Sequence, residues 1–353
     1  MSERLEAIVH GGDLDAARMR FPGAPEPWID LSTGINPCPY PLPELAGDAW
    51  QRLPQKSDEW TLRQVAACRY RAEGPENVVC APGTQALIQV LPRLVRPTHV
   101  AIVGPTYAEH AVAWQREGHD VVEIPYIEAA GVADVVVVVN PNNPTGRVTD
   151  TGRLRELAAS LHARGSLLVV DEAFVDVMPD QVSLVPCLPP ATVVLRSFGK
   201  MYGLAGARLG FAIAHEALAE RLRQALGPWA VAGPALAIGA AALADERWLS
   251  AARERLIADS RRLDAVLAAS GCDILGGTSL FRLAAHPRAS QLADVLGCHG
   301  IHVRRFSYAP TWLRLGLPGS EMAWQRLGLA LAGTGETQVG SSPGEQACRS
   351  DFR

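Results

Sequence analysis

Five consecutive valines, Val135 to Val139, constrain the fold of this chain more than any other feature. A run that is apolar at every position is typical of a strand buried on both faces, as in a parallel sheet covered by helices. The run ends in Asn140-Pro141-Asn142-Asn143-Pro144-Thr145-Gly146, a polar turn at the carboxyl end of the strand. Ligands of open α/β sheets bind at such ends. The run therefore predicts an α/β fold with a binding site beside this turn.

Similar apolar runs alternate with helical segments along residues 46–225, which predicts a mostly parallel sheet covered by helices. These runs are Val78 to Cys80, His99 to Val103, Val121 to Ile124, Val135 to Val139, Leu167 to Val170, Thr192 to Leu195 and Gly210 to Ala214. A chain of 353 residues, 48% of them hydrophobic, exceeds one ordinary core and suggests two unequal domains.

We expect four segments in this chain. Residues 1–45 form an arm that is too rich in proline to be helical, and residues 46–225 form the large domain. Residues 226–333 form a smaller C-terminal α/β domain, with a long helix over 246–270 and strands near 279–283 and 301–304. Residues 334–353 are polar and aperiodic, which predicts a disordered tail.

The segment from Ser197 to Phe211 joins one lysine to an anion-binding pair. Lys200 is a candidate for forming a Schiff base with a cofactor. Ser197, three residues before it, and Arg208, eight residues after it, could converge on a phosphate. The small residues between them would let the backbone turn closely around a planar cofactor. A glycine-rich loop with an exposed lysine is the alternative interpretation.

A second apolar strand, Ser166 to Val170, leads directly into Asp171. A carboxylate at the tip of a strand could hold a pyridinium nitrogen protonated and keep the ring an acceptor of electrons. A helix cap for Asp171 and a turn former for Asn143 are the structural alternatives. The three segments in this order favour a pyridoxal phosphate site.

These segments resemble the aspartate aminotransferase superfamily, fold type I of the pyridoxal phosphate enzymes, over nearly all of residues 1–333. The resemblance implies a large, mostly parallel sheet domain, a smaller C-terminal α/β domain, the cofactor pyridoxal 5'-phosphate and a homodimer. It implies that Lys200 is the catalytic residue and carries the cofactor. The other cofactor residues that it implies are Gly83, Thr84, Gln85, Tyr107, Asn143, Asp171, Ser197 and Arg208.

Each of these residues has an implied role. Asn143 donates to the phenolic oxygen of the cofactor, Asp171 meets the pyridine nitrogen, and Tyr107 stacks on the ring. The cradle for the cofactor phosphate is Gly83-Thr84-Gln85, at the start of a helix, together with Ser197 and Arg208.

Four further segments resemble one subfamily, the L-threonine-O-3-phosphate decarboxylases of cobalamin biosynthesis. They are His10-Gly11-Gly12, Asp30 to Pro37, Asp171-Glu172-Ala173-Phe174 and Leu195-Arg196-Ser197. This resemblance implies release of CO2 from L-threonine O-3-phosphate to give (R)-1-amino-2-propanol O-2-phosphate. The alternative is an aminotransferase of histidinol-phosphate type, because the superfamily motifs serve both reactions.

The substrate residues implied by the resemblance are His10, Gly34, Asn36, Arg304 and Arg314. Arg314 sits on a short apolar run, where a guanidinium would be costly unless it met a carboxylate, either that of the substrate or that of a structural ion pair. In two places the chain departs from the related histidinol-phosphate aminotransferases. Phe174 replaces a tyrosine, and Leu53 replaces the tyrosine that reaches the cofactor of the neighbouring subunit, so a contact from the partner stays open.

Charge and composition argue against other classes of protein. A net charge of -4 offers no basic field for nucleic acid, and no apolar run reaches the ~18 residues of a membrane helix. The N-terminus lacks the apolar region of a signal peptide. Seven scattered cysteines lack zinc spacing, which indicates reduced thiols, no metal and a cytoplasmic enzyme. Gly203, Gly206 and Gly210 lack the spacing of a nucleotide-binding oxidoreductase.

Overall fold

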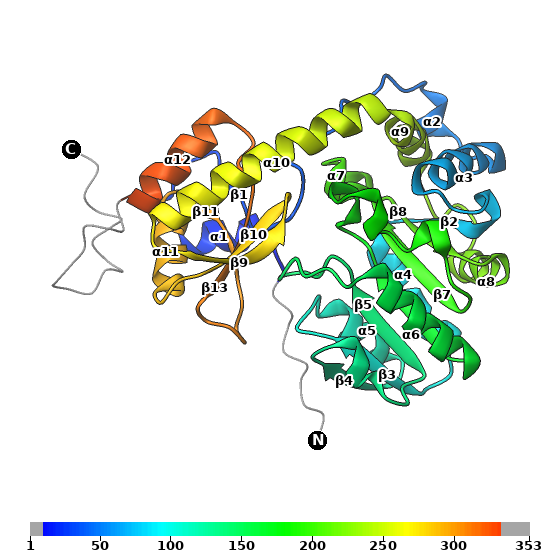
Figure 1. Cartoon of the computed structure of the whole chain (residues 1–353). Helices are drawn as coiled ribbons and strands as arrows, with labels where there is room; N and C mark the ends of the chain where they lie inside the picture. The colour runs from blue at the N-terminus through cyan, green and yellow to red at the C-terminus, as the bar shows by residue number, and fades with distance from the viewer. Residues whose placement is uncertain (1–9, 333–353) are drawn as a thin grey trace. The chain divides into compact units, whose positions relative to one another are not determined.

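The computed structural model describes residues 10–332, which divide into two compact units. The large unit comprises residues 38–254, and the small unit combines residues 10–37 with residues 255–332. Figure 1 shows the path of the chain. The predicted domain boundaries near residues 45, 225 and 333 stay predictions, and the predicted tail, 334–353, lies outside the described residues.

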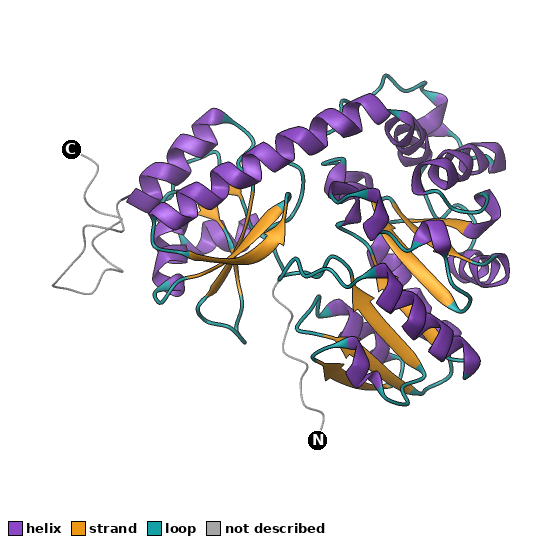
Figure 2. Ribbon diagram, in the orientation of Figure 1, coloured by secondary structure: helices purple, strands orange, loops and turns teal. Residues whose placement is uncertain are grey.

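The large unit is built on a seven-stranded sheet (Figure 2). Its strand order is β2 (Val78–Ala81), β8 (Gly210–Ala214), β7 (Thr192–Ser197), β6 (Leu167–Asp171), β5 (Val135–Val139), β3 (His99–Val103) and β4 (Asp120–Ile124). Only β8 runs antiparallel to its neighbours on both sides. All five valines of β5 are buried, as expected of a strand covered on both faces. The predicted mostly parallel sheet is confirmed.

Helices surround this sheet. They are α2 (Asp48–Gln51), α3 (Lys56–Tyr70), α4 (Thr84–Val90), α5 (Glu109–Arg116), α6 (Thr151–Ala163), α7 (Phe198–Met201), α8 (Glu216–Leu226) and α9 (Gly233–Ala244). Short 3-10 turns lie at Pro75–Asn77, Leu91–Leu94, Ile127–Ala130, Val175–Val177, Asp180–Val182, Val185–Cys187 and Ala205–Ala207. Side-chain caps define where some helices begin: Asp150 accepts from two backbone N–H groups at the start of α6.

The small unit contains two sheets. In the larger one, β12 (Arg304–Arg305), β13 (Trp312–Gly316), β10 (Phe281–Ala285) and β9 (Asp273–Thr278) lie in that order and are antiparallel. In the other, β1 (Ile29–Asp30) pairs in parallel with β11 (Ile301–His302), which joins the N-terminal segment to the C-terminal part of the chain. The helices are α1 (Leu14–Arg20), α11 (Ala289–Cys298) and α12 (Glu321–Ala332).

Helix α10 (Glu246–Ala269) begins in the large unit and continues into the small one, close to the predicted range. None of the helices within residues 10–332 is long and apolar enough to span a membrane.

The prediction of an arm without helix is wrong at α1. The prolines that argued against a helix begin only at Pro22, after the last residue of α1. Ahead of them, the side chain of Asp13 accepts a hydrogen bond from Ala16 N at 2.9 Å and caps the first turn. Proline disfavours a helix only around its own position, so the seven residues of α1, which precede Pro22, can still form a helix.

Candidate active site

The predicted cofactor residues of the large unit gather at one edge of its sheet. Val139, the last residue of β5, pairs with Asp171, the last residue of β6, and Asp171 pairs in turn with Leu195 of β7. The Asn140 N–H donates to the Asp171 carbonyl at 2.8 Å. The turn that carries Asn143, the Asp171 side chain and the segment leading to Lys200 therefore start from neighbouring strand ends.

The reversed strand β8 brings the predicted phosphate ligands together. Its first residue, Gly210, lies opposite Ala81 of β2 on one side and opposite Ser197 of β7 on the other. A Cβ on Gly210 would lie 2.6 Å from the backbone nitrogen of Thr84, the first residue of α4. The start of α4 and Ser197 thus flank the same glycine.

Arg208 packs directly against Gly83. A Cβ on Gly83 would lie 2.7 Å from Arg208 Nη2, and the φ of +84° at Gly83 also favours glycine. Arg208 itself is exposed, adopts a φ of 49° and donates from Nη1 to the Ala205 carbonyl at 3.3 Å. A guanidinium next to the start of a helix, held over a glycine without a side chain, forms a cradle that suits a phosphate.

Asp171 has a buried partner that sequence reasoning missed. His110 Nε2 lies 2.9 Å from Asp171 Oδ2, with both side chains almost fully buried. The other carboxylate oxygen accepts from the Ala173 N–H at 3.0 Å. These contacts fix the orientation of the carboxylate. The available signal was the place of His110, three residues after Tyr107 at the start of α5.

Tyr107 is held by Gln85, one of the predicted cradle residues. Its hydroxyl donates to Gln85 Oε1 at 3.2 Å, and Gln85 Nε2 donates to Glu109 Oε2 at 2.6 Å. The Tyr107 ring meets the His110 ring edge-on, with centroids 6.2 Å apart. Gln85 therefore acts through Tyr107, whereas Thr84 lies half-buried at the first position of α4.

The turn after β5 is fixed by two asparagines other than Asn143. Asn140 exchanges hydrogen bonds with the backbone of Thr149, and Asn142 Nδ2 donates to Thr145 Oγ1 at 2.8 Å. Asn143 lies half-buried in a turn whose shape is already set by these contacts. Lys200, on α7, is also half-buried, and its Nζ lies 5.5 Å from the centroid of the Phe174 ring.

The small unit brings the two predicted substrate arginines together. Arg304 of β12 and Arg314 of β13 lie directly opposite each other on antiparallel strands, so both side chains project from the same face of the sheet. Arg314 is buried and donates from Nη2 to the Ser32 carbonyl at 2.6 Å. Two like charges placed opposite each other repel, and an anion that contacts both would relieve this repulsion.

The other predicted substrate residues lie in the N-terminal segment that contacts these strands. The Gly12 N–H donates to Ser32 Oγ at 2.7 Å, and a Cβ on Gly11 would lie 2.4 Å from the Ser32 carbonyl oxygen. Gly34 and Asn36 are buried, and Asn36 Oδ1 accepts from Arg255 Nη2 at 3.1 Å. His10 is exposed at the start of this segment.

One titratable group near these arginines, His302, has a pKa that burial changes. Burial lowers the pKa of His302, with Arg305 and Arg304 adding to the effect and Asp30 opposing it. A neutral imidazole beside two guanidinium groups leaves the local positive charge on the arginines. No group of three or more His, Cys, Asp or Glu residues within residues 10–332 could hold a metal ion.

Comparison with known proteins agrees with this geometry. Residues 56–327 match the aminotransferase class I and II family. The chain belongs to this family. The predicted superfamily and the fold are thereby confirmed.

Several relatives within the family are close over nearly the whole chain. The threonine-phosphate decarboxylase of Pseudomonas aeruginosa is 46% identical over 333 residues, which cover 92% of this chain and 98% of that protein. The threonine-phosphate decarboxylase of a Sinorhizobium species is 45% identical over 329 residues, with the same coverage of 92% and 98%. A crystal structure of histidinol-phosphate aminotransferase from Sinorhizobium meliloti in complex with pyridoxal-5'-phosphate matches with a TM-score of 0.80. It covers 95% of this chain and 98% of that one at 22% identity, which shows the shared fold.

Gly210→Ala should loosen the phosphate cradle. The added Cβ would meet backbone atoms of Gly83 and Thr84, which cannot rotate away, and such overpacking costs about 1–3 kcal/mol. We expect a lower midpoint of thermal unfolding and faster loss of bound cofactor on dialysis. Gly206→Ala is the matched control, because nothing lies within 4 Å of a Cβ at that position. Equal behaviour of the two variants would show that the close approach at Gly210 has no energetic role.

Proposed function

We propose that this member of the family is a pyridoxal phosphate enzyme that releases CO2 from L-threonine O-3-phosphate, giving (R)-1-amino-2-propanol O-2-phosphate. The observation that carries the proposal is the identity of 45–46% over 92% of the chain to proteins named threonine-phosphate decarboxylases. The histidinol-phosphate aminotransferases to which the chain is also similar are more distant, at 26–34% identity. The subfamily that the sequence resembles catalyses this reaction in cobalamin biosynthesis. We therefore propose that the enzyme acts in that pathway.

The residues of the large unit fit the proposed cofactor. The cradle of Gly83, Ser197 and Arg208 offers a guanidinium and backbone N–H groups to its phosphate. The Asp171 carboxylate, oriented by His110, would accept a hydrogen bond from a protonated pyridine nitrogen. Tyr107, held by Gln85, supplies a ring for stacking. Lys200 is the amine that would attach the cofactor, and Asn143 the amide that would donate to its phenolic oxygen.

When bound, pyridoxal phosphate draws electrons away from the bonds at the α-carbon of an amino acid. The groups of the chain itself then select the reaction. Departure of CO2 leaves the α-carbon in need of one proton, and Lys200 Nζ is our candidate donor. Asp171, whose carboxylate is oriented at a buried position by His110, would accept a hydrogen bond from the protonated ring nitrogen of the cofactor. Phe174, whose ring lies near Lys200, is apolar where related aminotransferases carry a hydroxyl.

The substrate we propose carries two anionic groups, a phosphate and a carboxylate. The cross-strand arginines Arg304 and Arg314 offer two guanidinium groups on one face. We assign the phosphate to Arg304, which is half-buried, and the carboxylate to Arg314, which is anchored on the Ser32 carbonyl. His10, Gly34 and Asn36 would complete the substrate site from the N-terminal segment.

We further propose that the enzyme works as a homodimer in the cytoplasm. The large unit exposes several big apolar side chains on or next to the packed helices α2, α3 and α9: Leu42, Trp50, Leu53, Trp60 and Trp229. Exposed apolar side chains gathered on neighbouring elements are typical of an interface. Cys68, Cys80, Cys187 and Cys272 are free thiols, which accords with a reducing compartment.

The reaction is tested by supplying L-threonine O-3-phosphate to the purified enzyme with pyridoxal phosphate. We expect CO2 and the amine phosphate to form without any keto acid, measured by trapped CO2 and by mass spectrometry. Lys200→Ala is the control and should form neither product. Product that appears only with added 2-oxoglutarate, together with glutamate, would identify an aminotransferase instead.

The two predicted anion sites should separate in kinetics. Arg304→Ala should raise the KM for L-threonine O-3-phosphate about ten- to a hundredfold, since a charged hydrogen bond contributes roughly 1.5–3 kcal/mol. Arg208→Ala should instead weaken retention of the cofactor, measured as the concentration of pyridoxal phosphate that restores half of the activity. An Arg304→Ala effect of equal size on unphosphorylated L-threonine would contradict the role given to Arg304.

Trp50→Glu should convert the dimer into a monomer. Trp50, on α2, is 70% exposed, so the change should leave the folded subunit intact while placing a charge in the proposed interface. Sedimentation velocity measures the result. Val132→Glu, at a position 84% exposed in the loop before β5, is the control and should stay dimeric. A wild-type monomer, or a dimeric Trp50→Glu variant, would remove the support for this interface.

A further inference from the structure

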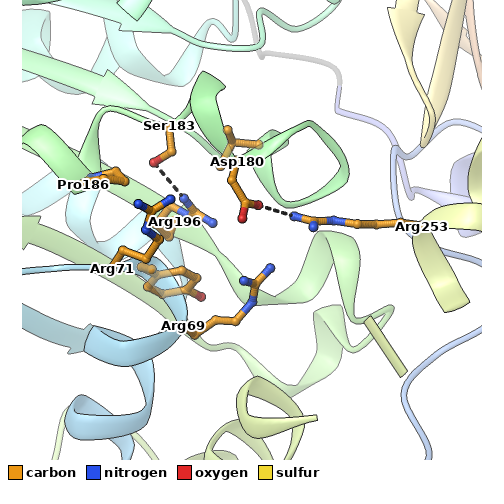
Figure 3. Close-up of a pocket in the computed structure, with 9 residues that line it drawn as sticks. Arg69, Arg71, Asp180, Ser183, Pro186, Arg196 and Arg253 are labelled. Carbon is orange, nitrogen blue, oxygen red and sulfur yellow. Dashed lines mark hydrogen bonds and ion pairs between the residues drawn. The ribbon is translucent and has the colours of Figure 1, made fainter. Parts of the chain in front are cut away.

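A pocket of the large unit is lined by four arginines and contains none of the residues assigned to cofactor or substrate (Figure 3). Arg69 and Arg71 come from the end of α3, Arg196 from β7 and Arg253 from α10, and Asp180 and Ser183 lie between them. Figure 3 shows these side chains around the pocket. Among the described residues, Asp180 is the only acidic one that lines it.

Arg196 lines the pocket and is buried. Its guanidinium pairs with Glu172 at 3.1 Å and with Asp176, and lies 4.2 Å from the centroid of the Tyr70 ring. Burial raises the pKa of Glu172, an effect that Arg196 opposes. Glu172 and Asp176 compensate the charge of Arg196, yet its Nε has no hydrogen-bond partner among the described residues.

Arg69 also has a buried Nε without a hydrogen-bond partner among the described residues. Its side chain is only 9% exposed and lies 3.6 Å from Glu246, whose own side chain is 66% exposed. The Nε of Arg69 is buried and finds no acceptor within the described part of the chain. Arg253, by contrast, donates from Nε to the Asp176 carbonyl at 2.6 Å and lies 3.3 Å from Asp180. Buried donors without acceptors lower stability unless a ligand or water completes them.

Arg71 adds a charge that nothing nearby compensates. Across residues 10–332, no hydrogen bond or ion pair reaches its side chain, which is exposed. Arg71 also ends α3 with a φ of 58°, a left-handed conformation that glycine adopts at lower cost.

We propose that this pocket binds a small tetrahedral oxyanion, either inorganic phosphate or the phosphate group of a monoester. Its donors come from the end of α3, β7 and α10, so they approach from several directions. A tetrahedral anion offers acceptor oxygens in several directions and up to two charges, whereas a carboxylate offers one charge in a plane. The two buried Nε groups and Arg71 would gain the acceptors that they lack in the protein alone.

The pocket and the cofactor cradle use opposite sides of the same strand. Arg196 and Ser197 are consecutive on β7, and consecutive side chains of a strand point to opposite faces. Glu172 likewise follows Asp171 directly after β6. The proposed site is therefore distinct from the cofactor phosphate site, although it is built on the strands that carry it. It does not depend on the proposed decarboxylation.

The test is calorimetric titration of inorganic phosphate into the holoenzyme, whose cofactor cradle is already filled. The starting protein carries Arg304→Ala, which removes the proposed phosphate ligand of the substrate site. We expect saturable binding that Arg71→Met, added to this protein, weakens about tenfold or more. Arg71→Lys should keep part of the affinity. Arg155→Met, an equal loss of charge at an exposed position of α6 outside the pocket, should leave binding unchanged.

Several results would overturn the proposal: no saturable binding of phosphate, equal losses for Arg71→Met and Arg155→Met, or acetate binding as tightly as phosphate. Arg253→Met provides a second variant at the opposite wall and should also weaken binding. Methyl phosphate distinguishes the two sources of the anion. Binding of methyl phosphate as tight as that of inorganic phosphate would identify a monoester site, whereas binding of inorganic phosphate alone would identify free phosphate as the ligand.

Discussion

The direction of strand β8 governs the geometry of the candidate cofactor site in the large unit. Because β8 is antiparallel to both β2 and β7, its first residue stands between the ends of those two strands. The start of α4, Ser197 and the loop carrying Arg208 must then share the space around Gly210. Gly83 and Gly210 meet this demand by having no Cβ. A phosphate could be held there because three distant parts of the sequence arrive at one point.

Charges buried on β6 and β7 are arranged by the alternation of side chains along a strand. Asp171 faces His110, while Glu172, the next residue, faces Arg196 together with Ser183 and the Leu184 N–H. Burial alone would lower the pKa of Arg196, but Asp176 and Glu172 reverse this and raise it. An ionised group without a partner would be costly in this sheet, and Arg196 meets two carboxylates there, those of Glu172 and Asp176.

Pairing between distant segments also arranges the arginines of the small unit. Its N-terminal segment is joined to β11 by β1 and to β13 by the Gly316 N–H, which donates to the Leu31 carbonyl at 2.7 Å. This arrangement brings Ser32 to Arg314 and leaves the Arg304 and Arg314 side chains on one face. Residues separated by nearly three hundred positions thus share one cluster, with no short motif linking them.

Local sequence predicted much of this structure. The valine run, the strand-end turn with Asn143, Asp171 after its strand and Lys200 after β7 all depend on neighbours in the chain, since apolar periodicity and turn residues report local structure. The same reasoning failed at α1, where prolines farther along the arm were given too much weight. It also missed His110 as the partner of Asp171, because their contact joins positions 61 residues apart.

The sequence by itself determined the fold class, the strands and the types of residue available for an anion and a cofactor. Only the tertiary structure decided which of these residues meet: Arg208 with Gly83, His110 with Asp171, Arg304 with Arg314, and Arg71 with Arg196 around a pocket. The physical reason is that periodicity and turn chemistry act over a few residues. The pairing of charges and the close approach of backbones are set instead by strand order and register, which depend on the packing of the whole unit.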